Sequence, residues 1–141
     1  MNYSQLLFIA GTIPFMYLGM VHVIIALKDI KDPRAFTPIN DNVRKQMMVS
    51  PLRFTDKTTM WKAWLGFNIS HGLGAFVFGL FLQLLVIQNP LCLIWLTPLA
   101  VCISAIYLWL SLKFWFNKPT IGIATGLLFL LLAWIIQLLF N

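Results

Sequence analysis

Four long runs of apolar residues, separated by shorter polar segments, dominate the hydrophobic pattern of the chain. They cover about residues 5–27, 61–87, 91–115 and 119–140, and none of them contains Asp or Glu. The hydrocarbon core of a bilayer takes about 20 apolar residues per helix, whereas membrane β-strands are shorter and alternate in polarity. The pattern predicts an all-α integral membrane four-helix bundle with antiparallel, up-and-down spans, forming a single transmembrane domain over residues 1–141.

Residues 28–60 form the one sizeable loop between the predicted spans and contain all four acidic residues of the chain. Within this loop, Asp41 is placed to cap a short helix in which Val43, Met47 and Met48 share one side. Such a helix would lie on the membrane surface, and the alternative is an irregular, solvated loop. Four basic side chains of this loop are predicted to contact lipid headgroups: Arg44, Lys45, Arg53 and Lys57.

Charge is distributed unevenly over the two sides of the predicted bundle. The chain is 60% hydrophobic and only 10% charged, with a mean hydropathy of +0.86. All 10 Lys and Arg residues lie in or beside the 28–60 loop and the 115–119 turn, and the opposite side has none. The positive-inside rule therefore predicts a multi-pass protein of the bacterial inner membrane with a cytoplasmic loop and both termini in the periplasm. The net charge of +6 follows from this asymmetry, and no nucleic-acid partner is expected.

Polar side chains of all four spans fall at similar depths in the cytoplasmic half of the predicted bundle. Asn68 and His71 are three residues apart, so they share one face of a helix. At about 1.5 Å per residue, the polar residues come out roughly 8–15 Å from the cytoplasmic boundary. Because polar groups in a membrane normally face the bundle interior, we expect one polar layer or pocket. Its predicted members are His22, Asn68, His71, Ser104, Tyr107 and Thr125.

Small residues flank both histidines and begin the last span, where two glycines form a GxxxG motif. Such residues let helix backbones approach closely, within one chain or between chains. The glycines predicted to serve helix packing are Gly19, Gly72, Gly74, Gly79, Gly122 and Gly126.

The polar layer has three interpretations. Its side chains could bond one another across helices and only fix the packing. They could instead form a ligand or catalytic pocket, with one histidine as acid or base and Asn68 or Tyr107 orienting the substrate. In the third interpretation, His22 and His71 on two antiparallel spans are the axial ligands of a haem b. Two histidines without nearby carboxylates or thiolates are too few for a closed metal site, so none is predicted.

The segments GMVHVIIAL (19–27) and WKAWLGFNISHGLGAFVFG (61–79) resemble uncharacterised small bacterial membrane proteins with four predicted spans. The resemblance covers roughly the first 80 residues and is strongest in the WxxWLGFNxSHG segment. The layout is also similar to that of DoxX-like and sterol-isomerase-like four-helix proteins. The uncharacterised family implies no activity, and the acidic residues that the isomerases use within the membrane are absent here.

These observations predict an accessory protein that binds lipid or a small ligand in a polar intramembrane pocket near the cytoplasmic face. One alternative is a haem-binding electron-transfer subunit with bis-His ligation, and another is a structural subunit of a membrane complex. No sequence motif indicates an enzyme. The expected partners are membrane lipid and either a membrane protein or a second copy of the chain.

The charge asymmetry generates the first testable prediction, which concerns topology. A reporter fused after Asn141 should behave as periplasmic, because an even number of spans returns the C-terminus to the side without Lys and Arg. The measurement is the activity of an alkaline phosphatase fusion, with a fusion in the 28–60 loop as the inactive control. A cytoplasmic result for the C-terminal fusion would overturn the predicted orientation.

Overall fold

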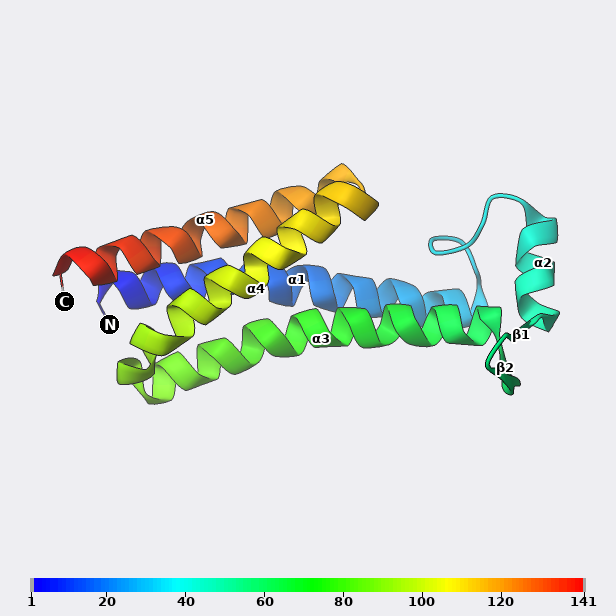
Figure 1. Ribbon diagram of the computed structural model, residues 1–141, viewed down its shortest axis with the longest axis horizontal. Helices are drawn as coiled ribbons and strands as arrows, with labels where there is room; N and C mark the ends of the chain where they lie inside the picture. Colours follow the sequence, from blue (N-terminus) through cyan, green and yellow to red (C-terminus); the bar gives the residue numbers. More distant parts are fainter. Residues whose placement is uncertain (1, 141) are drawn as a thin grey trace. The chain divides into compact units, whose positions relative to one another are not determined.

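The computed structural model describes residues 2–140, of which 83% are helical. These residues form five α-helices, one short 3-10 helix and a two-stranded antiparallel sheet (Figure 1). The elements in chain order are α1 (Tyr3–Lys31), α2 (Asp41–Val49), β1 (Pro51–Leu52), β2 (Thr55–Thr59), α3 (Met60–Gln88), η1 (Pro90–Cys92), α4 (Leu93–Phe114) and α5 (Asn117–Phe140).

Within residues 2–140, four helical segments are long and apolar enough to cross a membrane, which confirms the all-α prediction and the four apolar runs. They comprise α1, α3, η1 with α4, and α5, and contain 24 to 29 residues each. At a rise of about 1.5 Å per residue they are about 36–44 Å long, which exceeds the roughly 30 Å core of a bilayer. The four candidate spans therefore indicate a multi-pass membrane protein.

Helix α1 extends beyond its apolar run at both ends, and polar groups cap its beginning. The side-chain oxygen of Asn2 accepts a hydrogen bond from the backbone N–H of Gln5 at 2.9 Å. In return, the Gln5 side chain accepts from the backbone N–H of Asn2 at 2.8 Å. This reciprocal pair is a capping box, and it satisfies backbone donors that the first turn of a helix leaves unpaired. An apolar run thus marks the part of a helix that suits a bilayer, whereas its ends are fixed by such polar contacts.

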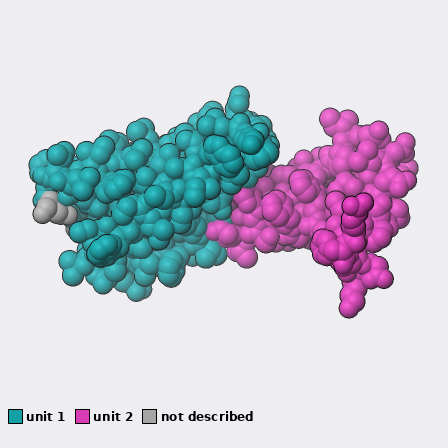
Figure 2. Space-filling view, viewed as in Figure 1, with its two compact units in different colours: residues 1–18, 75–141 teal, residues 19–74 magenta. Residues whose placement is uncertain are grey.

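The chain forms two compact units, and two of its helices contribute to both (Figure 2). One unit comprises residues 1–18 and 75–141, and the other comprises residues 19–74. The division falls within α1 and within α3, and each unit is described separately below.

In the unit formed by residues 1–18 and 75–141, segments of α1, α3, α4 and α5 surround an apolar core. The ring of Phe15 lies near its centre and makes edge-to-face contacts with Phe78 at 5.3 Å and Tyr107 at 6.2 Å between ring centroids. One buried polar pair bridges α4 and α5, where the Gln137 amide donates to the Thr97 hydroxyl at 2.8 Å. Because buried polar groups in a membrane need partners, this bond satisfies Gln137 inside the apolar core.

Glycines bring the helices of this unit into close contact. A Cβ added to Gly126 would lie 2.8 Å from the backbone oxygen of Gly11, and one added to Gly79 would lie 2.8 Å from that of Thr12. At Gly122 an added Cβ would come within 2.7 Å of the Leu18 side chain. The GxxxG motif of α5 therefore packs against α1 within this chain.

The unit formed by residues 19–74 contains the end of α1, the beginning of α3 and everything between them. Here a Cβ added to Gly72 would lie 3.0 Å from the backbone oxygen of Gly19, so α1 and α3 again approach closely. Gly74 differs from Gly72, Gly79, Gly122 and Gly126, because an added Cβ there would meet nothing within 4 Å.

Helix α2 confirms that the loop contains a short helix, but its predicted cap was wrong by one residue. The side chain of Asn40, and not that of Asp41, accepts from a first-turn backbone N–H, at 2.9 Å from Asn42 N. Asp41 is the first residue inside the helix, where the positive end of the helix dipole stabilises its carboxylate.

A β-hairpin that the hydrophobic pattern does not indicate follows α2 directly. Strand β1 pairs with β2 in an antiparallel ladder with a register shift after Pro51, and the turn contains Arg53 and Phe54. Three threonines favour the extended conformation of β2, but β1 has only two residues and β2 has no apolar residue, so neither shows alternation.

The close contacts of α3 predict opposite effects for two glycines of the same helix. Gly79→Ala should lower the free energy of unfolding by about 1–3 kcal/mol, since its Cβ would overlap the backbone of α1. Gly74→Ala should be neutral or raise stability by up to about 1 kcal/mol, because alanine is the better helix former and the space is open. The measurement is unfolding in mixed detergent micelles, and equal effects of the two substitutions would contradict the packing described here.

Candidate functional site

Two of the residues predicted for the polar layer are joined by a hydrogen bond between α1 and α3. Asn68 is only 4% exposed, and its side-chain nitrogen donates to the backbone oxygen of Trp64 at 2.8 Å. Its side-chain oxygen lies 3.1 Å from Nε2 of His22. Because an amide oxygen can only accept, Nε2 of His22 carries the hydrogen of this bond, and in the neutral form of the ring the lone pair is then at Nδ1.

The second histidine lies directly beside the first. The rings of His22 and His71 meet edge to face, with 5.4 Å between their centroids. Phe36 covers His22 at 4.5 Å, and Phe67 stacks on His71 at 5.9 Å with an interplanar angle of 12°. We call these five residues the histidine cluster: His22, Phe36, Phe67, Asn68 and His71. It combines two half-buried imidazoles and a fixed amide with aromatic walls.

The buried carboxylate of Asp29 holds the chain that covers His22. Asp29 is 2% exposed although it lies in the last turns of α1. It accepts hydrogen bonds from the backbone N–H groups of Arg34 at 3.0 Å, Ala35 at 3.1 Å and Phe36 at 2.6 Å. Hydrogen bonds to a charged acceptor each contribute about 1.5–3 kcal/mol. The chain after α1 is therefore turned back so that Phe36 reaches the imidazole of His22.

A further hydrogen bond ties this covering segment to α3. The indole N–H of Trp64 donates to the backbone oxygen of Phe36 at 2.7 Å. Phe36 is thus fixed at its N–H by Asp29 and at its oxygen by Trp64. Asn68, in turn, is bonded to the backbone of Trp64. Trp64 therefore links the segment that carries Phe36 to the histidine cluster.

A cleft of about 420 Å³ opens beside the histidine cluster. Its wall includes Phe36 of the cluster and the indole of Trp64, together with Met47 of α2. The remaining lining residues are Ala35, Thr37 and Pro38. The cleft is shallow and mostly apolar, and Phe36 is its one residue from the histidine cluster.

The other three predicted pocket residues belong to the unit of residues 1–18 and 75–141. Ser104 is fully buried, and its hydroxyl has no hydrogen-bond partner among the described residues. Tyr107 is half-buried and packs on Phe15. Thr125 is exposed and donates to the Ile121 oxygen of its own helix at 2.9 Å. The structure thus brings His22, Asn68 and His71 together, while a single layer of all six residues stays a prediction.

Sequence reasoning missed the residues that complete the site around the histidines. Phe36 lies in a loop, where an apolar residue is not part of a periodic pattern. Asp29 follows the first apolar run, where an acidic residue is common at the membrane boundary. One signal was present, because an acid at a helix end followed by a proline is well placed to accept from a turning backbone. Its three partners are five to seven residues away, beyond the spacing of the usual capping motifs.

The histidines of this structure do not fit a haem between them. In bis-His ligation the two imidazoles approach the iron from opposite faces of the macrocycle. Here the rings touch each other, and Nε2 of His22 is bonded to Asn68. The backbones of α1 and α3 are in contact at Gly72, next to His71. Over residues 2–140, no group of three or more His, Cys, Asp or Glu side chains could hold a metal ion.

Comparison with protein-family models, with curated proteins and with solved structures finds no match for this chain. Its function is therefore inferred from its own residues.

The role of Asp29 gives a prediction with a close control. Asp29→Asn should accelerate amide hydrogen exchange at residues 34–36 by about tenfold or more, because the charged acceptor of three N–H groups is lost. Asp32→Asn should change it little, since Asp32 forms only an exposed ion pair with Arg34, and such pairs contribute at most about 1 kcal/mol. Unchanged exchange in Asp29→Asn would show that the covering segment is held by other contacts.

Proposed function

We propose that this protein is a four-span protein of the bacterial inner membrane that binds a small ligand at the histidine cluster. Both termini lie in the periplasm, and residues 28–60 lie in the cytoplasm with the cluster just inside that face. The charge asymmetry of the chain supports this orientation, and the four candidate spans support membrane insertion. Its role is that of an accessory or ligand-binding protein.

One observation carries this proposal: His22 and the pair Asn68 and His71 converge although they are 46 and 49 residues apart along the chain. Burying imidazoles and an amide in an apolar setting costs free energy unless they have hydrogen-bond partners or bind a ligand. A packing role alone would require only the bond between His22 and Asn68. The second histidine, the aromatic walls and the separately fixed cover are additional features that favour a binding site.

The cluster also indicates what kind of ligand it takes. Nδ1 of a neutral His22 ring is an acceptor, and His71 adds an imidazole that can donate or accept. The surrounding rings of Phe36 and Phe67 and the neighbouring cleft are largely apolar. The ligand is thus a small amphipathic molecule, with a hydroxyl, carbonyl or carboxyl group at the imidazoles and an apolar body against the rings.

A second candidate function, that of a structural subunit in a membrane complex, is favoured by the outer side of α3. Gly66 and Gly74 have open space at their Cβ positions, and Ser70 lies between them at the same four-residue spacing and is exposed. Such a spacing permits close approach of another helix. The GxxxG motif of α5 does not support this role as well, because Gly122 and Gly126 already contact α1.

The binding proposal predicts that His71→Ala removes a co-purifying ligand while leaving the protein folded. The protein is purified in mild detergent, and bound small molecules are measured by native mass spectrometry and by extraction. Occupancy should fall about tenfold or more, since an unmade hydrogen bond to a polar group costs about 1–3 kcal/mol. The matched control is Ser70→Ala, which removes only a hydroxyl bonded to the Phe67 oxygen of the same helix.

The outcomes separate the two candidate functions. Loss of ligand in His71→Ala with an unchanged unfolding transition supports the site. The structural role is favoured if His71→Ala fails to fold and the unaltered protein carries no bound ligand. Full retention of both ligand and stability removes His71 from the site.

A further inference from the structure

We propose that a second cleft, at the cytoplasmic end of α1, binds the headgroup and upper acyl chain of an anionic phospholipid. The cleft has a volume of about 950 Å³ and is lined only by the end of α1 and the turn that follows it. Its lining residues are Ile24, Ile25, Leu27, Lys28, Asp29, Ile30, Lys31, Asp32, Arg34 and Ala35.

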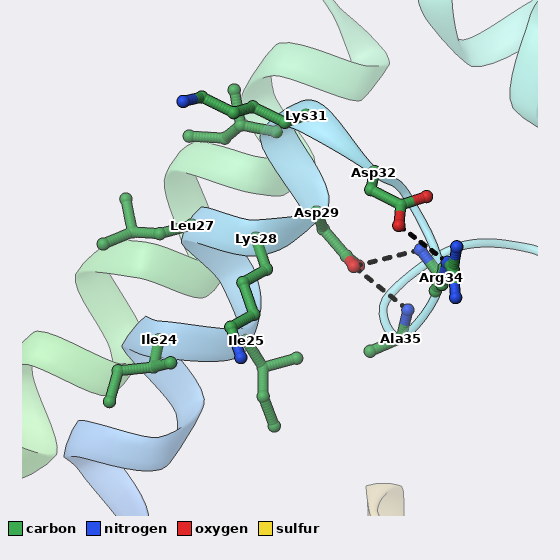
Figure 3. Close-up of a pocket in the computed structure, with 10 residues that line it drawn as sticks. Ile24, Ile25, Leu27, Lys28, Asp29, Lys31, Asp32, Arg34 and Ala35 are labelled. Carbon is green, nitrogen blue, oxygen red and sulfur yellow. Dashed lines mark hydrogen bonds and ion pairs between the residues drawn. The ribbon is translucent and has the colours of Figure 1, made fainter.

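Apolar and charged side chains line this cleft together. Ile24 and Ile25 lie at the lower end of the view, with the amine of Lys28 beside them, whereas Arg34 lies on the right beyond Asp29 and Lys31 lies at the upper end (Figure 3). These residues span the predicted membrane boundary near residue 27. A phospholipid likewise joins acyl chains to a phosphate at this depth.

Basic side chains outnumber acidic ones in the lining of the cleft, three to two, which favours an anion. The three basic residues are Lys28, Lys31 and Arg34. The two lysines lie in the last turn of α1, where they also offset the partial negative charge of the helix end.

The two acids of the cleft do not cancel this preference. The carboxylate of Asp29 is turned away from the lysines into three backbone N–H groups, two of which are drawn in Figure 3. Asp32 pairs with Arg34 at 2.8 Å, but both side chains are largely exposed. An exposed pair of this kind contributes little, so a phosphate can compete for the guanidinium, which binds phosphate with two parallel hydrogen bonds.

The occupant is a lipid of the surrounding membrane because the cleft joins an apolar wall to cations at the bilayer surface. Basic sites at the cytoplasmic end of membrane helices are typical binding places for anionic headgroups. This inference rests on the membrane orientation proposed above, but it does not depend on the histidine cluster. It differs from the predicted headgroup contacts of Arg44, Lys45, Arg53 and Lys57, which lie outside this cleft.

The test uses the full chain, delipidated in an uncharged detergent and titrated with short-chain phosphatidylglycerol or phosphatidylcholine of the same chain length. Binding is followed by native mass spectrometry. The unaltered protein should prefer phosphatidylglycerol about tenfold or more, as expected for one or two charge-assisted hydrogen bonds. K28Q/K31Q should lose most of this preference, and K28R/K31R should keep it.

The control variant K113Q/K118Q removes the same charge at the other basic turn, where both lysines are exposed. It should change the preference less than twofold. An equal loss in both glutamine variants would mean diffuse attraction and overturn the proposal, as would an unaltered protein without a preference. Displacement of phosphatidylglycerol by an equal concentration of inorganic phosphate would show that the lipid is not the ligand.

The same samples keep this inference separate from the proposed function. K28Q/K31Q should retain the small ligand of the histidine cluster, because neither lysine belongs to it. Loss of that ligand together with the lipid preference would indicate one shared site and overturn the proposal of a separate lipid site.

Discussion

The close approach of α1 and α3 is the constraint on which the rest of the structure depends. Two glycines of α3 face the backbone of α1, Gly79 opposite Thr12 and Gly72 opposite Gly19. Helices in a membrane gain little from the hydrophobic effect when they associate, so close contact must supply the attraction. The same contact allows short side chains to reach across the seam. Asn68 can bond His22 only because the backbones beside it are separated by no large residue.

Much of the fold could be predicted from the sequence, and the reason lies in the membrane. Continuous apolar runs such as residues 119–140 must form helices in lipid, since no other single segment satisfies its own backbone there. The shared helix face of residues three or four positions apart, such as Asn68 and His71, could also be predicted. The segment from Asp29 to Met60 was less predictable, because the hairpin and the fold-back depend on partners outside any local period.

The candidate site shows the same division between local and distant information. His22, Asn68 and His71 stood out as polar residues in apolar surroundings, and the structure places them in contact. Phe36 could not be recognised, since its position over His22 results from hydrogen bonds made by its backbone to Asp29 and Trp64. Every residue type has the same backbone groups, so the sequence does not indicate which partners the backbone of Phe36 bonds.

The way Asp29 holds the covering segment has a consequence for how this protein can diverge. The carboxylate bonds only main-chain N–H groups of residues 34–36, which every amino acid except proline provides. Substitutions at Arg34 and Ala35 therefore leave the fold of the segment intact while altering the lining of the cleft beside it. Asp29 itself has no such freedom, because no other side chain offers two short, charged acceptor atoms at that distance. Selection can thus change the surface at two positions without first having to rebuild the loop that presents them.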